Sequence, residues 1–309
     1  MSLRPEQHAP PSPVPARRPT VRDLVALAAP DRGLPGGEAL YRHAALLAGL
    51  GAGDELLSVG CGTASGLRFL VERYGVHGSG VDVDPHAVEG GEARSRGAGL
   101  AERMHVQAAP MDALPYRDGI FDVTLAELGL TARALPGPAI QELARVTRPG
   151  GTVLLIQLAW TAPVPEGRRH RIEALLGFRP LAVVEWKRLL GDAGIDAVHA
   201  EDWTEGPTAL MPRPIEPLLE LADRLSWRAR LDVSRLAWRR WGLRGALDAW
   251  GEGSRLQRLL ARERVLSLVL LKGTRRVAPP LPAPPVDEGV RAQDVSDLPL
   301  FGPVAGAAR

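Results

Sequence analysis

The chain has 309 residues, of which 45% are hydrophobic and 24% charged, with a formal net charge of +2. This composition is that of an ordinary soluble protein, and no apolar run approaches the roughly 20 residues that a membrane-spanning helix needs. The small charge does not by itself indicate nucleic-acid binding, and the single cysteine, Cys61, excludes an internal disulfide and a multi-cysteine metal site. The histidines lack ligand spacing, so we expect no catalytic metal. No apolar leader is visible, so we expect a cytoplasmic protein.

Both ends of the chain are rich in proline. Residues 1–19 contain six prolines and no apolar periodicity, and residues 278–309 contain the run APPLPAPP. Such segments cannot bury enough apolar surface to offset the entropy of ordering. We therefore predict disordered tails at 1–19 and 278–309, and one folded domain over residues 20–277.

Between residues 37 and 203, helix-like and strand-like patterns alternate. The apolar spacing predicts helices at 37–50, 67–75, 85–96, 138–147 and 181–194. Short apolar runs predict strands at 55–60, 78–84, 103–108, 119–128, 149–160 and 195–203. This alternation predicts an α/β fold: a doubly wound, mostly parallel sheet with helices on both faces.

The segment 212–262 breaks this alternation, because its pattern is helical throughout. An apolar run at 264–273 follows it and predicts the seventh and last strand, so we expect a helical insertion before that strand. Residues 223–264 contain eleven arginines and five acidic residues, a net charge of +6. The insertion also contains several tryptophans: Trp227, Trp238, Trp241 and Trp250.

Three interpretations of this insertion are open. One is an amphipathic lid that turns its tryptophans to the core and its arginines to solvent. A second is an interfacial helix, at 225–250, that contacts anionic lipid and admits an apolar small molecule. A third is an RNA-contacting surface that uses arginine on phosphates and tryptophan for stacking, against which the small total charge argues.

The run LLSVGCGTASG at 56–66 ends a predicted strand and opens a predicted helix, with glycine at positions 60, 62 and 66. Glycines let a ligand approach the backbone, and a helix N-terminus offers N–H groups. Asp82 ends the next strand twenty residues beyond Gly62, where a carboxylate can accept the hydroxyl hydrogens of a ribose. We therefore predict a nucleoside ligand. The alternative is a tight turn, with Asp82 capping the helix that starts near Pro85.

Four segments in order resemble the class I S-adenosylmethionine-dependent methyltransferases, nearest the branch of quinone-biosynthesis and other small-molecule enzymes. They are LLSVGCGTASG, GSGVDVDPHAVEGGEAR, QAAPMDALPYRDGIFDV and ELARVTRPGGTVLL. The resemblance covers about residues 34–203 and the final strand. It implies a Rossmann-like methyltransferase fold, S-adenosyl-L-methionine as cofactor, and methyl transfer to a small, apolar or aromatic acceptor.

The resemblance also implies which residues bind the cofactor. The glycine loop would run alongside the methionine part, Asp82 would grip the ribose hydroxyls, and Val83 would pack on the adenine. Met111 would lie at the adenine edge, and Glu127 near the methionine moiety or the substrate. The whole predicted set is Ser58, Gly60, Cys61, Gly62, Asp82, Val83, Met111, Asp112 and Glu127. We expect Cys61 to be a small packed residue and not a nucleophile.

Three positions depart from the family pattern. Ser58 replaces the acid that usually begins the glycine loop and cannot balance the cofactor's ammonium group. Ala64 replaces the usual third glycine, and its methyl group is harmless only if the residue keeps a negative φ. Pro110 stands where an aspartate commonly reads the adenine amino group, and Asp112 could substitute after a small loop shift. These departures predict a weaker site than the family norm.

Methyl transfer from a sulfonium depends mainly on positioning, so it needs no nucleophile–base pair. For a hydroxyl or carbon-acid acceptor a general base would help, and the candidates by location are Glu127, His43 and Tyr41, each of which also has a structural interpretation. We expect the acceptor to contact the helix near 36–50, the loop after Glu127, the segment 161–180 and the insertion.

Two other functions compete with a small-molecule enzyme. One is a methyltransferase-like binding or regulatory module with weakened or lost catalysis, which Ser58, Ala64 and Pro110 favour. The other is an RNA methyltransferase that uses the arginines of the insertion. Nothing in the sequence indicates an oligomeric state.

Overall fold

The computed structural model describes residues 37–128, 130–203, 227–263 and 265–277. The predicted tails at 1–19 and 278–309, and the part of the insertion at 212–226, lie outside the described residues. None of the helices in the described part combines the length and apolar character that crossing a bilayer requires.

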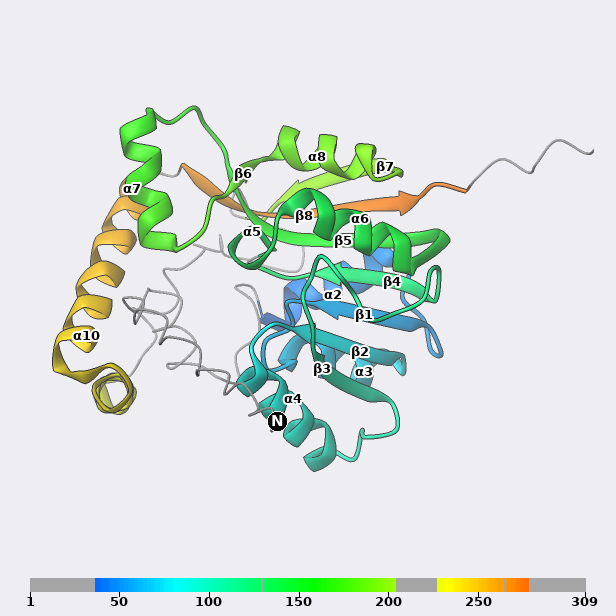
Figure 1. The fold of residues 1–309 in the computed structure, drawn as a ribbon, viewed down its shortest axis with the longest axis horizontal. Coiled ribbons are helices and arrows are strands. Elements are labelled where there is room, and N and C mark those ends of the chain that lie inside the picture. Colours follow the sequence, from blue (N-terminus) through cyan, green and yellow to red (C-terminus); the bar gives the residue numbers. More distant parts are fainter. Residues whose placement is uncertain (1–36, 129, 204–226, 264, 278–309) are drawn as a thin grey trace, which may run out of the picture. The chain divides into compact units, whose positions relative to one another are not determined.

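A central sheet organises the fold, with strand order β3-β2-β1-β4-β5-β8-β7 (Figure 1). Its strands are β1 (Glu55–Val59), β2 (His77–Asp82), β3 (Met104–Ala108), β4 (Phe121–Ala126), β5 (Thr147–Trp160), β7 (Ile195–Asp202) and β8 (Leu266–Arg275). The two pairings of β8, with β5 and β7, are antiparallel, whereas the other pairs along this path are parallel. The seven-stranded, mostly parallel sheet is confirmed.

The order of the strands reverses beside β1, because the chain moves outward to β2 and β3 and then returns to β4 on the other side. In open sheets of this kind, ligands bind at the carboxyl ends of the strands at such a reversal. The carboxyl ends of β1, β2 and β4 therefore mark where a site is expected.

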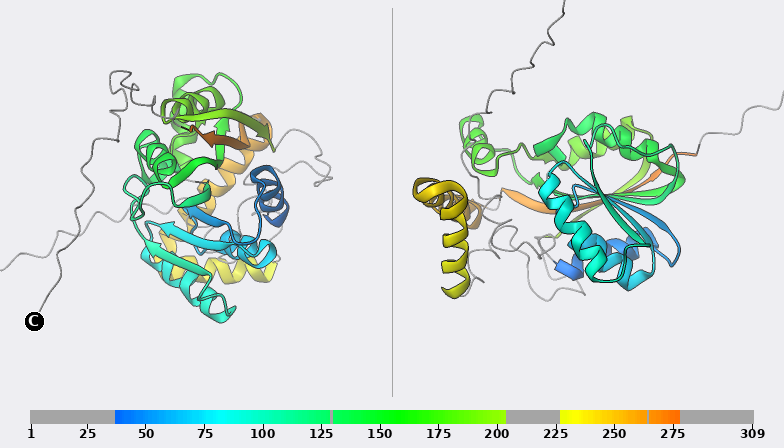
Figure 2. Two further views of the ribbon diagram at one scale, coloured as in Figure 1. Left: turned by 90° about the vertical axis from the view of Figure 1, so that its right-hand side faces the viewer. Right: turned by 60° about the horizontal axis from the view of Figure 1, so that its bottom comes forward.

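Helices cover both faces of the sheet (Figure 2). The helices of the described residues are α2 (Gly37–Ala48), α3 (Ser65–Tyr74), α4 (Pro85–Gly97), α5 (Leu130–Arg133), α6 (Pro136–Val146), α7 (Glu166–Leu176), α8 (Val183–Asp192) and α10 (Trp227–Glu263). One core joins α2 and α3 to the sheet through residues such as Leu40, Leu67 and Leu125. A second core, on the opposite face, joins α6 and α8 through residues such as Ile140 and Trp186.

Local sequence signals set several helix ends. Gly75 ends α3 in the left-handed conformation with φ 70°, and its N–H bonds to the carbonyl of Val71, as expected of a glycine at this position. Pro85 opens α4, and Asp84 caps that helix by accepting a hydrogen bond of 3.0 Å from the N–H of His86. The alternative in which Asp82 caps α4 is therefore wrong.

The structure contains elements that the sequence pattern does not predict. Helix α7 and the short α5 lie in segments without clear apolar spacing, and β6 (Leu181–Ala182) adds two residues of parallel pairing to the end of β5. Within the described residues the sheet thus has eight strands: the seven at the predicted places and β6.

The helical insertion precedes β8 as expected, and its described part is α10. Within α10, two helical stretches meet at a kink at Gly242, whose φ of 71° and ψ of 173° are not helical. Small side chains on either side of this kink form a cluster of their own, with Trp241 and Trp250 packed against it: Val233, Ala237, Ala246 and Ala249.

Candidate functional site

The glycine loop between β1 and α3 bends sharply beside the end of β2. Gly60 and Gly62 have φ values of 73° and 55°, a region that side chains other than glycine rarely adopt. The N–H groups of Gly60 and Cys61 donate to the carbonyl of Val81, at 2.8 and 3.2 Å. A Cβ atom on Gly60 would lie 3.2 Å from Cε of Met111, whereas one on Gly62 would meet no heavy atom of the described residues within 4 Å. Within the described structure, the Gly62 side of the loop is therefore open.

Ala64 completes the loop in a conformation that the sequence alone did not reveal. It has φ 58° and ψ 27° at the start of α3 and its side chain is fully buried. The condition that it keep a negative φ is therefore not met, and the left-handed conformation costs roughly 1–2 kcal/mol for a residue with a Cβ. The fold retains the bend despite this cost.

Asp82 turns toward the glycine loop. Its side chain is only 2% exposed. Oδ2 accepts a hydrogen bond of 2.9 Å from the N–H of Gly62, and Oδ1 accepts one of 3.0 Å from the N–H of Asp84. Backbone donors from both sides thus fix the orientation of the carboxylate at the end of β2.

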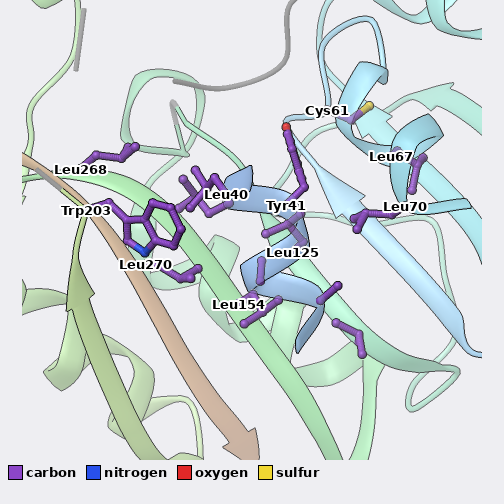
Figure 3. Packing of buried hydrophobic residues seen from close by; sticks show 14 of the residues in the cluster. Leu40, Tyr41, Cys61, Leu67, Leu70, Leu125, Leu154, Trp203, Leu268 and Leu270 are labelled. Atoms are coloured by element: carbon purple, nitrogen blue, oxygen red, sulfur yellow. The ribbon is translucent and has the colours of Figure 1, made fainter. Parts of the chain in front are cut away.

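A second buried carboxylate, that of Glu127, lies at the end of β4. The hydroxyl of Tyr41 on α2 donates to Oε2 over 2.7 Å, and the hydroxyl of Ser58 on β1 donates to Oε1 in a short hydrogen bond. Figure 3 shows Tyr41 extending from α2 toward the loop that carries Cys61. Three of the predicted residues, Ser58, Glu127 and Tyr41, therefore meet in one hydrogen-bonded chain.

Glu127 is a weak acid in this environment. Burial raises its pKa to about 7, and the negative charge of Asp82 acts in the same direction. The hydrogen bonds from Ser58 and Tyr41 oppose this shift without cancelling it. The carboxyl group therefore changes its charge near neutral pH.

Cys61 is a packed residue of the bend. It is buried, and a Cβ on Gly80 would lie 3.0 Å from its Sγ. Burial raises the pKa of its thiol well above the usual range, and the charges of Glu127 and Asp82 raise it further. A thiol held neutral in this way is a poor nucleophile, as expected from the sequence.

The loop after β3 carries Met111 and Asp112. Met111 is buried against the Gly60 side of the glycine loop, whereas Asp112 is exposed. Val83, just beyond β2, is partly buried and packs against the same core as Met111. The structure thus places Val83 and Met111 in one apolar cluster, with Asp112 at the surface.

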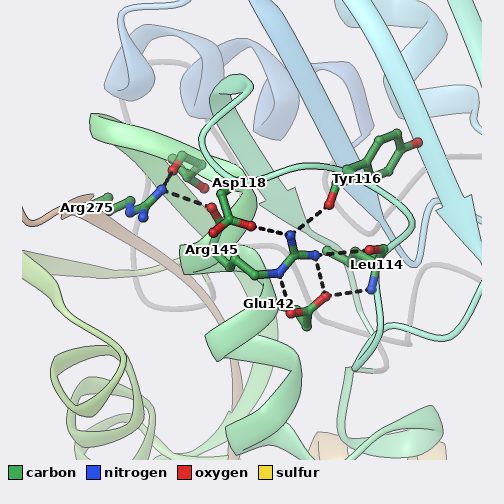
Figure 4. Close-up of polar contacts among 7 residues, drawn as sticks. Leu114, Tyr116, Asp118, Glu142, Arg145 and Arg275 are labelled. Atoms are coloured by element: carbon green, nitrogen blue, oxygen red, sulfur yellow. Dashed lines mark hydrogen bonds and ion pairs between the residues drawn. The ribbon is translucent and has the colours of Figure 1, made fainter.

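Arg145 on α6 fixes this loop (Figure 4). Its guanidinium group donates to the carbonyl oxygens of Tyr116 at 2.7 Å and Leu114 at 3.0 Å, and pairs with Glu142 over 2.6 Å. Glu142 in turn accepts a hydrogen bond of 2.7 Å from the N–H of Leu114, and the Arg145 hydrogen bonds lower its pKa. Neither Arg145 nor Glu142 is among the predicted site residues. Their spacing of three on a helix was the available signal.

His43 is not part of the group formed by Glu127, Tyr41 and Ser58. Its Nε2 is 2.6 Å from Oε2 of Glu201 on β7, and its ring contacts Trp203 edge-on with a centroid distance of 5.0 Å. His199 also contacts Glu201, at 3.1 Å. The structure therefore places His43 with β7 and not in the hydrogen-bonded chain of Glu127. Within the described ranges, no group of three or more His, Cys, Asp or Glu residues has the arrangement of a metal site.

Helix α7 packs its two buried apolar residues, Ile172 and Leu176, on the core that also contains α2. The guanidinium carbon of Arg169 lies 5.6 Å from the ring centroid of Trp160, at the end of β5. Trp160 is 6% exposed, and its indole Nε1 has no hydrogen-bond partner in the described structure. A buried apolar cluster that includes an indole N–H donor thus lies at the carboxyl end of β5.

Comparison with protein families and curated proteins gives two matches of note. The family described as "Methyltransferase domain" matches residues 57–155. A 27-O-demethylrifamycin SV methyltransferase from Amycolatopsis mediterranei (strain S699) is 32% identical over 173 residues, which are 53% of this chain and 63% of that protein. The chain spans between 54% and 65% of the length of the first curated relatives that it matches.

Solved structures share the fold at low identity. The [4+2]-cyclase SpnF has a TM-score of 0.64 at 20% identity, covering 84% of this chain and 93% of its own. A geranyl diphosphate C-methyltransferase from Streptomyces coelicolor A3(2), in complex with Mg²⁺, geranyl diphosphate and S-adenosyl-L-homocysteine, has a TM-score of 0.61 at 18% identity. That match covers 77% of this chain and 78% of the other. These likenesses establish the Rossmann-like architecture.

Proposed function

We propose that this chain, which belongs to the class I S-adenosylmethionine-dependent methyltransferases, transfers the methyl group of S-adenosylmethionine to a small, apolar or aromatic acceptor. The observation that carries the proposal is the position of Asp82. Its carboxylate lies 2.9 Å from the N–H of Gly62, at the sheet edge where a nucleoside is expected.

The residues present fit an adenosyl group. None of the described residues fills the space beside Gly62, so a ligand can contact the backbone there. Asp82 presents a carboxylate held in place by two backbone N–H groups, which suits a pair of ribose hydroxyls. Val83 and Met111 supply apolar surface on one side, which suits a purine ring.

S-adenosylmethionine, when bound, supplies a methyl group on a sulfonium that is a good leaving group. The protein's part is to orient the two reactants and exclude water, and such positioning can account for most of the acceleration. Asp82 and the glycine loop would hold the nucleoside, and Met111 would cover the apolar side of the nucleoside. The loop after β3, which carries Met111, would move little, because Arg145 binds two carbonyl groups of that loop.

Calorimetric titration with S-adenosylmethionine and S-adenosylhomocysteine tests the proposal. We expect binding of both, and a loss of about 10- to 100-fold in affinity for Asp82→Ala, since each charge-assisted hydrogen bond is worth about 1.5–3 kcal/mol. Asp82→Asn retains the shape of the side chain and serves as the matched variant. Absence of binding to the wild-type protein at millimolar ligand would defeat the proposal.

The buried apolar cluster at the carboxyl end of β5 supports an apolar or aromatic acceptor. Trp160, Ile172 and Leu176 belong to one buried cluster there, and Leu128 and Phe178 pack against it. The indole N–H of Trp160 offers a buried donor to an oxygen of the acceptor. Native mass spectrometry of the purified protein, with and without added cofactor, would identify small molecules held at this cluster.

A binding module without catalysis is the competing proposal. The strained Ala64 and the exposed Pro110 favour it, and the likeness to a cyclase means that the fold alone does not fix the reaction. Incubation with isotopically labelled S-adenosylmethionine and an extract of small molecules separates the two. Label transferred to an acceptor supports the enzyme, whereas tight binding of cofactor without transfer supports the module.

Peripheral contact of α10 with an anionic membrane is a further part of the proposal. Trp238, Leu243 and Leu247 are 60%, 63% and 62% exposed, and Arg239 and Arg240 are exposed beside them. Exposed apolar side chains next to arginines are typical of helices that lie in a membrane interface. Such a contact would give an apolar acceptor a route from the lipid.

A further inference from the structure

The chain has no acid at position 58, yet a buried carboxylate occupies the space beside that residue. Ser58 pairs with Leu125 across the parallel strands β1 and β4, and Glu127 follows two residues later on the same face of the sheet. The N–H of Glu127 donates to the carbonyl of Val59 over 2.8 Å. This hydrogen bond holds the backbone of Glu127 beside the end of β1. The Ser58 hydroxyl then donates directly to Glu127 Oε1.

We propose that Glu127 supplies from β4 the carboxylate that residue 58 lacks, and that it binds the ammonium group of the cofactor's methionine part. This inference rests on the proposed function. It assigns to Glu127 the task of binding the cofactor, in place of that of a general base toward the acceptor.

The charge balance of the site supports this assignment. Glu127 is 5% exposed, and the side chains that donate to it, Tyr41 and Ser58, are neutral hydroxyls. The neighbouring charge of Asp82 disfavours its ionised form. Among the described residues no cation pairs with this buried carboxylate, and a ligand ammonium group would provide one.

The same geometry explains why serine stands at position 58. An acid there would place a second carboxylate within hydrogen-bonding distance of Glu127, since the Ser58 hydroxyl already is. Two ionised carboxylates at that separation repel each other. Serine donates a hydrogen bond instead, so Ser58 and Tyr41 act as positioning residues for Glu127.

A pair of ligands separates this role from a general effect on the site. S-adenosylhomocysteine carries the ammonium group, whereas 5′-methylthioadenosine has the same nucleoside without the amino-acid part. At about pH 7.5, we expect Glu127→Gln to weaken S-adenosylhomocysteine binding by about 10- to 100-fold in calorimetric titrations. Binding of 5′-methylthioadenosine should change by less than about threefold.

Two further variants complete the experiment. Glu201→Gln removes a partly buried glutamate on β7 and should leave both affinities unchanged. Ser58→Asp combined with Glu127→Gln returns the acid to β1 and should recover most of the S-adenosylhomocysteine affinity. Circular dichroism confirms that each variant is folded.

The outcomes are distinguishable. Equal binding of S-adenosylhomocysteine by the wild type and Glu127→Gln, or an equal loss for both ligands, overturns the role of Glu127 while leaving the proposed function intact. Failure of the double variant to recover affinity overturns the equivalence of positions 58 and 127. A wild-type protein that binds neither ligand overturns the proposed function itself.

Discussion

The hydroxyl of Tyr41 lies 2.7 Å from Oε2 of Glu127 and joins α2 to the end of β4. This contact links a helix at the beginning of the described chain to the edge of the sheet where the glycine loop lies. Replacing Tyr41 with phenylalanine removes only the hydroxyl oxygen, so this substitution measures what α2 contributes to the site.

Tyr41→Phe should weaken binding of S-adenosylhomocysteine by about 3- to 10-fold, because the buried carboxylate of Glu127 loses one donor. The ring itself stays in place over Gly66, so the core is retained. Calorimetric titration checks the affinity, and thermal unfolding provides the control. A variant with unchanged affinity would mean that the Tyr41 contact does not hold Glu127 in its binding orientation.

The buried Glu127 also makes the stability of the protein depend on pH. Its pKa is raised from 4.5 to about 7, so between these values the folded state holds the proton more tightly than the unfolded state. The free energy of unfolding should therefore fall as pH rises through this window, by on the order of 2–3 kcal/mol, and level off above it.

Glu127→Gln removes this titration. The variant should be more stable than the wild type at about pH 8, and the difference should shrink toward about pH 3.5, where Glu127 is protonated in both states. Urea unfolding of both proteins across this range measures the difference. Other facing groups, namely Asp82, Cys61 and Tyr41, are common to both proteins. A difference that does not vary with pH would contradict the raised pKa.

Gly66 should not tolerate a side chain. A Cβ there would lie 2.0 Å from Cζ of Tyr41, so Gly66→Ala should destabilise the protein by about 1–3 kcal/mol or more and displace the tyrosine. Gly167→Ala in α7, where a Cβ meets nothing within 4 Å, is the matched control and should gain about 0.5–1 kcal/mol. Combining Gly66→Ala with Tyr41→Ala should relieve the clash, giving a clearly non-additive double-mutant cycle.

Arg145 should matter for the loop that carries Met111. Arg145→Met removes its hydrogen bonds to two backbone carbonyls and its pair with Glu142, and we expect a loss of about 2 kcal/mol in stability together with weaker S-adenosylhomocysteine binding. Arg188→Met, at a mostly exposed pair with Asp192 on α8, should change stability by less than about 0.5 kcal/mol. Hydrogen exchange of residues 109–120 should increase in Arg145→Met alone.

The proposed membrane contact of α10 is tested by sedimentation with vesicles. We expect binding to vesicles that contain anionic lipid, binding that weakens as salt rises, and a loss on changing Leu243 and Leu247 to Glu. Leu135→Glu alters a leucine that is 70% exposed in the connection between α5 and α6, and should leave binding unchanged. If the wild type, the variant at Leu243 and Leu247, and Leu135→Glu all bind vesicles equally, α10 does not make the membrane contact.

The sheet and most helices could be predicted because their signals are local. The alternation of apolar runs, Gly75 and Pro85 each act within a few residues. Helix α7 could not be predicted, because only Ile172 and Leu176 among its described side chains are fully buried and charged residues surround them. Its position depends on packing against the core formed by distant parts of the chain.

The candidate site was predictable in part for the same reason. Asp82 could be found by its distance from Gly62 and its place at a strand end. The pairing of Ser58 with Glu127 could not, because it joins residues sixty-nine positions apart and depends on the register of β1 and β4. The positive φ of Ala64 also escaped prediction, since alanine carries no local signal for that conformation.

The thiol of Cys61 can report on opening of the glycine loop between β1 and α3. It is the chain's single thiol, it is buried in the bend, and its high pKa slows alkylation. The rate at which a maleimide or iodoacetamide labels the native protein therefore measures how often the bend opens. A ligand that closes over the bend will slow that labelling, so its occupancy can be followed without knowing what it reacts with.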